Sequence, residues 1–253
     1  MDKRWEREAK EHFTRSWSER RGIESIDRNA WIVLVKVPLD QLSSVLAQRA
    51  TESRRDVLGS EIEVVGSFAF TYQLVGHDWS IVPDPPMGSG LAQRHELAAL
   101  SRQLGQPIIE LSLSDTSGRI GYNLFERGKL VEHFEGQEND DDEYDAHGLQ
   151  TQRYVLSPYQ DDPEAVQTAY FWSSRRQVTS EEIGNIWDFA NKLMLEYDAF
   201  DPDISVAYLL GEYPKHGKRY RIENPGFTLV VNPTTEVLSV PELVRVDYFR
   251  FGK

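Results

Sequence analysis

The sequence predicts an α+β protein with one or more mainly antiparallel sheets and a few covering helices, built as one large domain or as two closely packed subdomains. Three observations support this. The 253 residues are 40% hydrophobic and 27% charged, which is typical of a globular domain and sufficient for a sizeable core. Apolar residues recur with the period of a strand in several segments and with the period of a helix in fewer. Turn-forming residues separate these segments at short intervals.

The first expected element is an amphipathic helix over residues 2–21. Trp5, Ala9, Phe13 and Trp17 recur at every fourth position among charged residues, so they share one helix face. This aromatic stripe packs on the protein's own domain, or it docks into the groove of a partner. Under the second alternative, Trp5 and Trp17 are partner-binding residues.

A continuous apolar run over residues 31–37 predicts a buried strand. A helix is expected next, over residues 39–50, with the charged residues 52–56 as its exposed exit. From residue 61 the apolar period changes to two, which suggests a hairpin over 62–82.

Three prolines and two glycines predict a loop over residues 83–90. Helical spacing resumes over 91–104, with Gly105 as the stop signal. Two further strands over 108–113 and 120–125, separated by short turns, indicate a meander. This order of elements predicts helices that cover one face of the sheet.

Residues 137–148 form the strongest compositional break, with six acidic residues among twelve. Self-repulsion of these charges favours a solvated loop. We therefore expect an N-terminal α+β region over 1–136, an acidic linker over 137–148 and a C-terminal α+β region over 149–253.

The C-terminal region is expected to contain a strand over 167–173 and then a helix. Thr179 and Glu182 match a capping box, and apolar residues continue at helical spacing as far as Tyr197. Four short strand candidates follow, at 204–210, 219–222, 227–231 and 244–251.

Composition excludes several classes of function. The chain has no cysteine, so it forms no disulfide and has no thiolate nucleophile or metal ligand. Residues 1–21 lack the apolar run of a signal peptide, and no apolar stretch approaches the roughly 18 residues that span a bilayer. We expect a cytoplasmic protein that does not bind a membrane. No phosphate-binding glycine motif is present, and no cofactor is expected.

Charge is distributed unevenly along the chain. Residues 1–60 carry 12 basic and 10 acidic side chains, whereas residues 61–253 carry 16 and 31. An acidic body repels nucleic acid and attracts a basic protein. The carboxylates expected to meet such a partner share one segment of the acidic linker: Asp140, Asp141, Asp142, Glu143 and Asp145.

No established catalytic motif is present. The six histidines are scattered without metal-binding spacing, so no metal site is predicted. A site assembled from residues distant in sequence would draw on carboxylates and histidines, and His77, Asp78 and Asp115 are the candidates.

Three functions therefore remain open. The first is a non-enzymatic protein-binding protein, for instance a bacterial inhibitor or immunity-type protein, that uses its acidic surface. The second is an enzyme built from dispersed carboxylates and histidines. The third is a structural subunit of a larger assembly. The sequence does not predict the oligomeric state.

Overall fold

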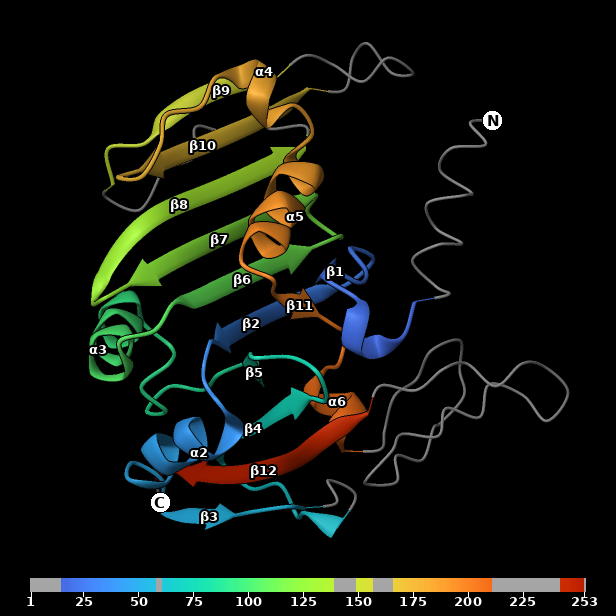
Figure 1. Cartoon of the computed structure of the whole chain (residues 1–253), viewed down its shortest axis with the longest axis vertical. Helices are drawn as coiled ribbons and strands as arrows, with labels where there is room; N and C mark the ends of the chain where they lie inside the picture. The colour runs from blue at the N-terminus through green and yellow to red at the C-terminus, as the bar shows by residue number, and fades with distance from the viewer. Residues whose placement is uncertain (1–14, 58–60, 139–148, 157–165, 211–241, 253) are drawn as a thin grey trace, which may run out of the picture.

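The computed structural model describes residues 15–57, 61–138, 149–156, 166–210 and 242–252. Within these ranges the chain is α+β, as predicted, with one large antiparallel sheet, a small parallel pair of strands and a few helices (Figure 1). No helix in these ranges has both the length and the apolar character needed to cross a membrane.

The ten strands of the large sheet form one continuous twisted layer (Figure 1). In spatial order they are β3 (Glu52–Arg54), β12 (Leu243–Phe251), β4 (Ser67–Leu74), β5 (Ser80–Pro83), β2 (Asn29–Val35), β6 (Ile108–Ser114), β7 (Arg119–Glu126), β8 (Lys129–Glu138), β10 (Gln167–Ser173) and β9 (Gln152–Leu156). The parallel pair is β1 (Gly22–Ile23) with β11 (Phe200–Asp201). The helices are η1 (Trp17–Glu19), α2 (Leu39–Ala47), α3 (Arg94–Leu104), α4 (Ser180–Ile183), α5 (Ile186–Glu196) and α6 (Val206–Leu209).

Strands from both predicted regions pair directly in this sheet. β8 pairs antiparallel with β10, and the C-terminal strand β12 lies between β3 and β4. Of the predicted acidic linker, Gln137 and Glu138 end strand β8, and residues 139–148 lie outside the described ranges.

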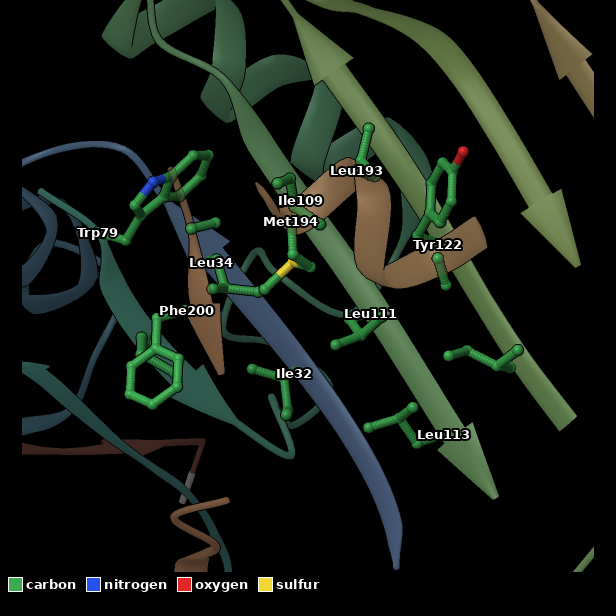
Figure 2. Packing of buried hydrophobic residues seen from close by; sticks show 14 of the residues in the cluster. Ile32, Leu34, Trp79, Ile109, Leu111, Leu113, Tyr122, Leu193, Met194 and Phe200 are labelled. Carbon is green, nitrogen blue, oxygen red and sulfur yellow. The ribbon is translucent and has the colours of Figure 1, made fainter. Parts of the chain in front are cut away.

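Helices α2 and α3 of the predicted N-terminal region cover one face of the sheet, as expected, and α5 of the C-terminal region covers the other face. Ile32 and Leu34 of β2 belong to a core layer that includes α5. Val33 and Val35, which alternate with them, belong to a second layer with α2 and α3. The continuous apolar run of β2 results from burial on both sides. Figure 2 shows the first layer, where Met194 of α5 lies close to Leu34 and Ile109.

The helix predicted from Thr179 to Tyr197 is two helices. The capping box is confirmed, because the Glu182 backbone N–H donates to the Thr179 hydroxyl and the Glu182 carboxylate accepts from the Thr179 N–H. The helix then ends at Gly184, whose φ of 60° and ψ of −114° favour glycine. The Asn185 side chain accepts from two backbone N–H groups and begins α5.

Other predicted elements are confirmed or corrected. The strand over 31–37, the helix over 39–50, the hairpin, the meander and the strands over 167–173 and 244–251 are present with small shifts. Residues 52–56 contain edge strand β3 instead of a helix exit, and residues 204–210 contain helix α6 instead of a strand. Strands β1, β9 and β11 were not predicted. The strand candidates 219–222 and 227–231 lie outside the described ranges.

Candidate functional site

The structure does not bring the predicted catalytic residues together. His77 and Asp78 lie in the turn before β5, next to the Val35 end of β2. Asp115 lies in the turn between β6 and β7, next to the Asn29 end of β2. A strand of seven residues is about 20 Å long at roughly 3.3 Å per residue. This separation exceeds the reach of side chains that act on one substrate atom.

His77 holds the N-terminal segment on the core. Its Nε2 donates a hydrogen bond of 2.7 Å to the Trp17 carbonyl, and its ring stacks on Phe200 with centroids 5.3 Å apart. Burial lowers the pKa of His77 below its ordinary value, and the hydrogen bond to Trp17 opposes this shift. A neutral imidazole that donates from Nε2 fits this position. Its contacts are structural.

The predicted partner-binding residues are only partly described. Trp17 packs on the protein's own core, with its ring centroid 6.0 Å from that of Phe200 and the Arg20 guanidinium 4.0 Å above it. The other predicted partner-binding residues lie outside the described ranges: Trp5, Asp140, Asp141, Asp142, Glu143 and Asp145.

A polar network crosses strands β2, β6, β7 and β8 on the sheet face opposite α5. The Trp31 indole N–H donates to Glu110 Oε1 at 2.9 Å. The Asn123 amide nitrogen donates to Glu110 Oε2 at 2.8 Å. Glu110 thus accepts one hydrogen bond on each oxygen, and this fixes the orientation of the Asn123 amide.

Asn123 in turn orients the ring of His133. Its amide nitrogen donates to Glu110, so its oxygen faces His133 Nδ1 at 2.8 Å. Nδ1 therefore carries a hydrogen, and Nε2 is the other nitrogen of the ring. This Nε2 lies 3.5 Å from Glu135 Oε1, and Arg94 Nη2, at the first residue of α3, lies 3.8 Å from the same oxygen.

A hollow adjoins the network. The residues that line it come from β6, β7, β8 and β10: Ser112, Arg119, Ile120, Gly121, Glu135, Gly136, Gln137 and Tyr170. We call it the sheet-face hollow. Its volume is about 180 Å³, below the roughly 300 Å³ at which sites for drug-sized ligands begin. It can hold one side chain or a small ligand.

Gly121 makes room for the hollow. A Cβ atom at this position would lie 3.0 Å from the Phe134 carbonyl oxygen and 3.2 Å from Ser112 Oγ. Both contacts are tight, and any larger side chain would project between Ser112 and Glu135. A glycine inside a strand marks such a place of close approach.

The sequence carries one signal for this site, in strands β7 and β8. Polar residues alternate along β7 and along β8, and the pairing register places them opposite one another: Arg119 with Gln137, Gly121 with Glu135, and Asn123 with His133. A solvated sheet face has the same alternation, so only the register identifies a connected cluster.

Other buried carboxylates form ion pairs with arginines. Glu132 is fully buried and accepts from Arg176, and Asp247 is fully buried and accepts from Arg245 and Arg55. Burial opposes ionisation of Asp247, yet hydrogen bonds from Arg245 and Ser43 keep its pKa below the ordinary value. These pairs hold β8 to the segment after β10 and β12 to the segment after β3.

No protein-family model, curated protein or solved structure matches this chain. Among the described residues, no three His, Asp or Glu side chains are grouped so that they could hold a metal ion.

Proposed function

We propose that this is a non-enzymatic binding protein that works in the cytoplasm and recognises a basic protein partner. The partner places one cationic side chain in the sheet-face hollow. An inhibitor or immunity-type role fits this mode of action, because such proteins act by occupying a surface of their target.

Net charge supports the basic character of the partner. The chain carries a formal charge of −13, which raises the rate of encounter with a cationic surface and disfavours anionic ones such as nucleic acid. The effect is screened within about 8–10 Å at physiological salt, so contacts at short range must provide the specificity.

The single observation that carries the proposal is the hollow with Glu135 in its wall. A volume of about 180 Å³ suits one anchoring side chain, and interfaces concentrate their binding energy in a few such anchors. Glu135 is the carboxylate of the lining and Tyr170 supplies an aromatic face for a cationic group, while Arg119 in the same wall donates to Gln137 Oε1 at 3.0 Å.

The network behind Glu135 supports a preformed site. Trp31, Glu110, Asn123 and His133 are linked by hydrogen bonds of 2.8–2.9 Å, so the wall of the hollow is positioned before a partner arrives. Preorganised contacts lose less entropy on binding.

The two alternatives gain less support. For an enzyme, the predicted residues His77, Asp78 and Asp115 lie at opposite ends of β2. For a structural subunit, the described end of the aromatic stripe, Trp17, packs on the chain's own core.

The proposal is tested by affinity capture from the cells that make the protein, at low and at physiological salt. We expect a basic protein that is retained more strongly at low salt. Glu135→Gln should weaken its retention, whereas Glu181→Gln, which removes the same charge from an exposed position in α4, should not. Equal retention by both variants, or no specific partner at either salt concentration, would contradict the proposal.

A further inference from the structure

A second pocket lies at the beginning of β2 and shares no lining residue with the sheet-face hollow. Its wall contains charged and polar residues from three segments and apolar groups between them: Arg28, Asn29, Ala30, Trp31, Ile32, Pro83, Asp84, Asp203, Ile204 and Ser205. Its volume is about 170 Å³. We call it the Asp84 pocket.

The arginine of this pocket is already neutralised. Arg28 Nη1 donates to Asp203 Oδ1 at 2.7 Å, and Nη2 donates to Asp201. The Asp201 side chain is 1% exposed and Arg28 is 11% exposed, so this triad is a buried structural unit. Two carboxylates against one guanidinium leave the triad with an excess negative charge.

Asp84 adds a carboxyl group that is not committed to an ion pair. Among the described residues, no lysine, arginine or histidine nitrogen lies within 4.0 Å of it, although Arg28 acts on it at longer range. Its backbone is fixed, because its N–H donates to the Trp31 carbonyl at 2.7 Å and its neighbours are Pro83 and Pro85. Its φ of 46° lies in the left-handed region, which aspartate tolerates better than most residues.

We propose that the Asp84 pocket binds a small primary amine in its ammonium form. The ammonium group donates to the Asp84 carboxylate, and the alkyl part packs on Ile32, Pro83 and Ile204. The negative charge of the triad favours a cation and disfavours an anion. The volume admits a ligand of a few heavy atoms, smaller than a drug-sized molecule.

The electrostatics of Asp84 predict how binding depends on pH. Desolvation at the pocket wall raises its pKa above the ordinary value, although the residue as a whole is exposed, and the Trp31 backbone and Arg28 oppose the shift. The other charged groups of the pocket are Asp203 and, behind it, Asp201. The amine binds the ionised carboxylate. The affinity for the amine is therefore maximal at neutral pH and falls as acid protonates Asp84. It also falls near pH 10, where the amine itself loses its proton.

The test is a titration of the full chain with butylammonium chloride at pH 7, followed by NMR and calorimetry, with 1-butanol as the neutral control. We expect saturable binding of the amine and none of the alcohol. Asp84→Asn should weaken binding at least tenfold.

The matched control is Asp78→Asn, which removes the same charge from an exposed turn outside this pocket. It should bind as the parent protein does, and the melting temperature of both variants shows that they are folded. Equal affinity of Asp84→Asn and the parent, equal binding of 1-butanol, or the absence of saturable binding would overturn the proposal. None of these results bears on the protein partner of the sheet-face hollow.

Discussion

Glu132 shows how a single charged residue can organise the sheet from inside the core. It is fully buried on β8 and accepts from Arg176 Nη2 at 2.7 Å, from the Tyr122 hydroxyl at 2.7 Å and from Ser173 Oγ at 2.9 Å. Burial, with the neighbouring Glu132 carboxylate, raises the pKa of Tyr122 well above its ordinary value, so this phenol stays a donor. Each partner supplies a hydrogen that the buried carboxylate needs.

Glu132→Gln should therefore destabilise the fold strongly. The amide cannot balance the charge of Arg176, which is 34% exposed, and we expect a loss of about 3 kcal/mol, the lower end of the range for breaking a buried ion pair. Urea unfolding of the parent and the variant measures this loss in the free energy of unfolding.

Glu52→Gln is the matched control, because Glu52 pairs with Arg250 at 3.1 Å near the surface. It should cost less than about 1 kcal/mol. Similar losses for the two variants would show that the Glu132 cluster is not a buried ion-pair centre.

His77 makes stability depend on pH in a defined direction. Its folded pKa is lowered, mainly by burial, so the unfolded chain binds the proton more readily. The contribution of His77 is complete above the unfolded value of about 6.5 and is lost as pH falls through the folded pKa.

The variant His77→Gln keeps a donor for the Trp17 carbonyl and does not titrate. Between pH 7.5 and pH 5, the melting temperature of the parent should fall more than that of the variant. A constant difference between the two across this range would contradict the pKa direction.

At the scale of elements, the break between α4 and α5 separates the sequence expectation from the structure. Helical spacing continues from Ile183 to Tyr197, and nothing in that period indicates an interruption. The break results from two residues. Gly184 adopts a conformation that other residues avoid, and the side chain of Asn185 caps the next helix.

Gly184→Ala distinguishes the two arrangements by the sign of its effect. In one continuous helix, alanine would stabilise by about 1 kcal/mol. At the observed φ of 60°, we expect destabilisation by about 1–3 kcal/mol. Thermal unfolding measures the sign, and an increase in stability would refute the observed break.

The sequence predicted strands well where the apolar pattern was long and poorly where it was short. The run of β2 and the meander β6–β7 were clear, because most of their residues are buried on at least one face. β3 and β9 are edge strands of three and five residues. Their pairing depends on partners distant in sequence, which no local pattern reports.

At the scale of the whole molecule, fewer carboxylates are available for binding a partner than the composition suggests. Arginines neutralise buried carboxylates at Glu132, Asp201 and Asp247. The composition predicted an acidic surface, but it could not predict which carboxylates are buried in ion pairs within the fold. The proposed recognition of a basic partner therefore depends on a few carboxylates such as Glu135 in the sheet-face hollow, which Arg94 approaches to 3.8 Å.

The candidate site itself could not be predicted from sequence. Trp31, Glu110, Asn123 and His133 come from four strands, and only the sheet order β2-β6-β7-β8 brings them together. The alternative residues His77, Asp78 and Asp115 were conspicuous locally, but the pairing of β5 and β6 with β2 places them at opposite ends of that strand.

The most direct test of the central claim is to fill the sheet-face hollow and measure the dissociation constant of the captured basic partner. Ser112 is an exposed residue of the lining, and Ser112→Phe places a ring in the hollow, whereas Gln103→Phe adds the same ring to an exposed position on α3. The account predicts that Ser112→Phe weakens binding by about tenfold or more, as expected for a blocked anchor site, and that Gln103→Phe leaves it unchanged. Unchanged binding by a folded Ser112→Phe variant would contradict the account.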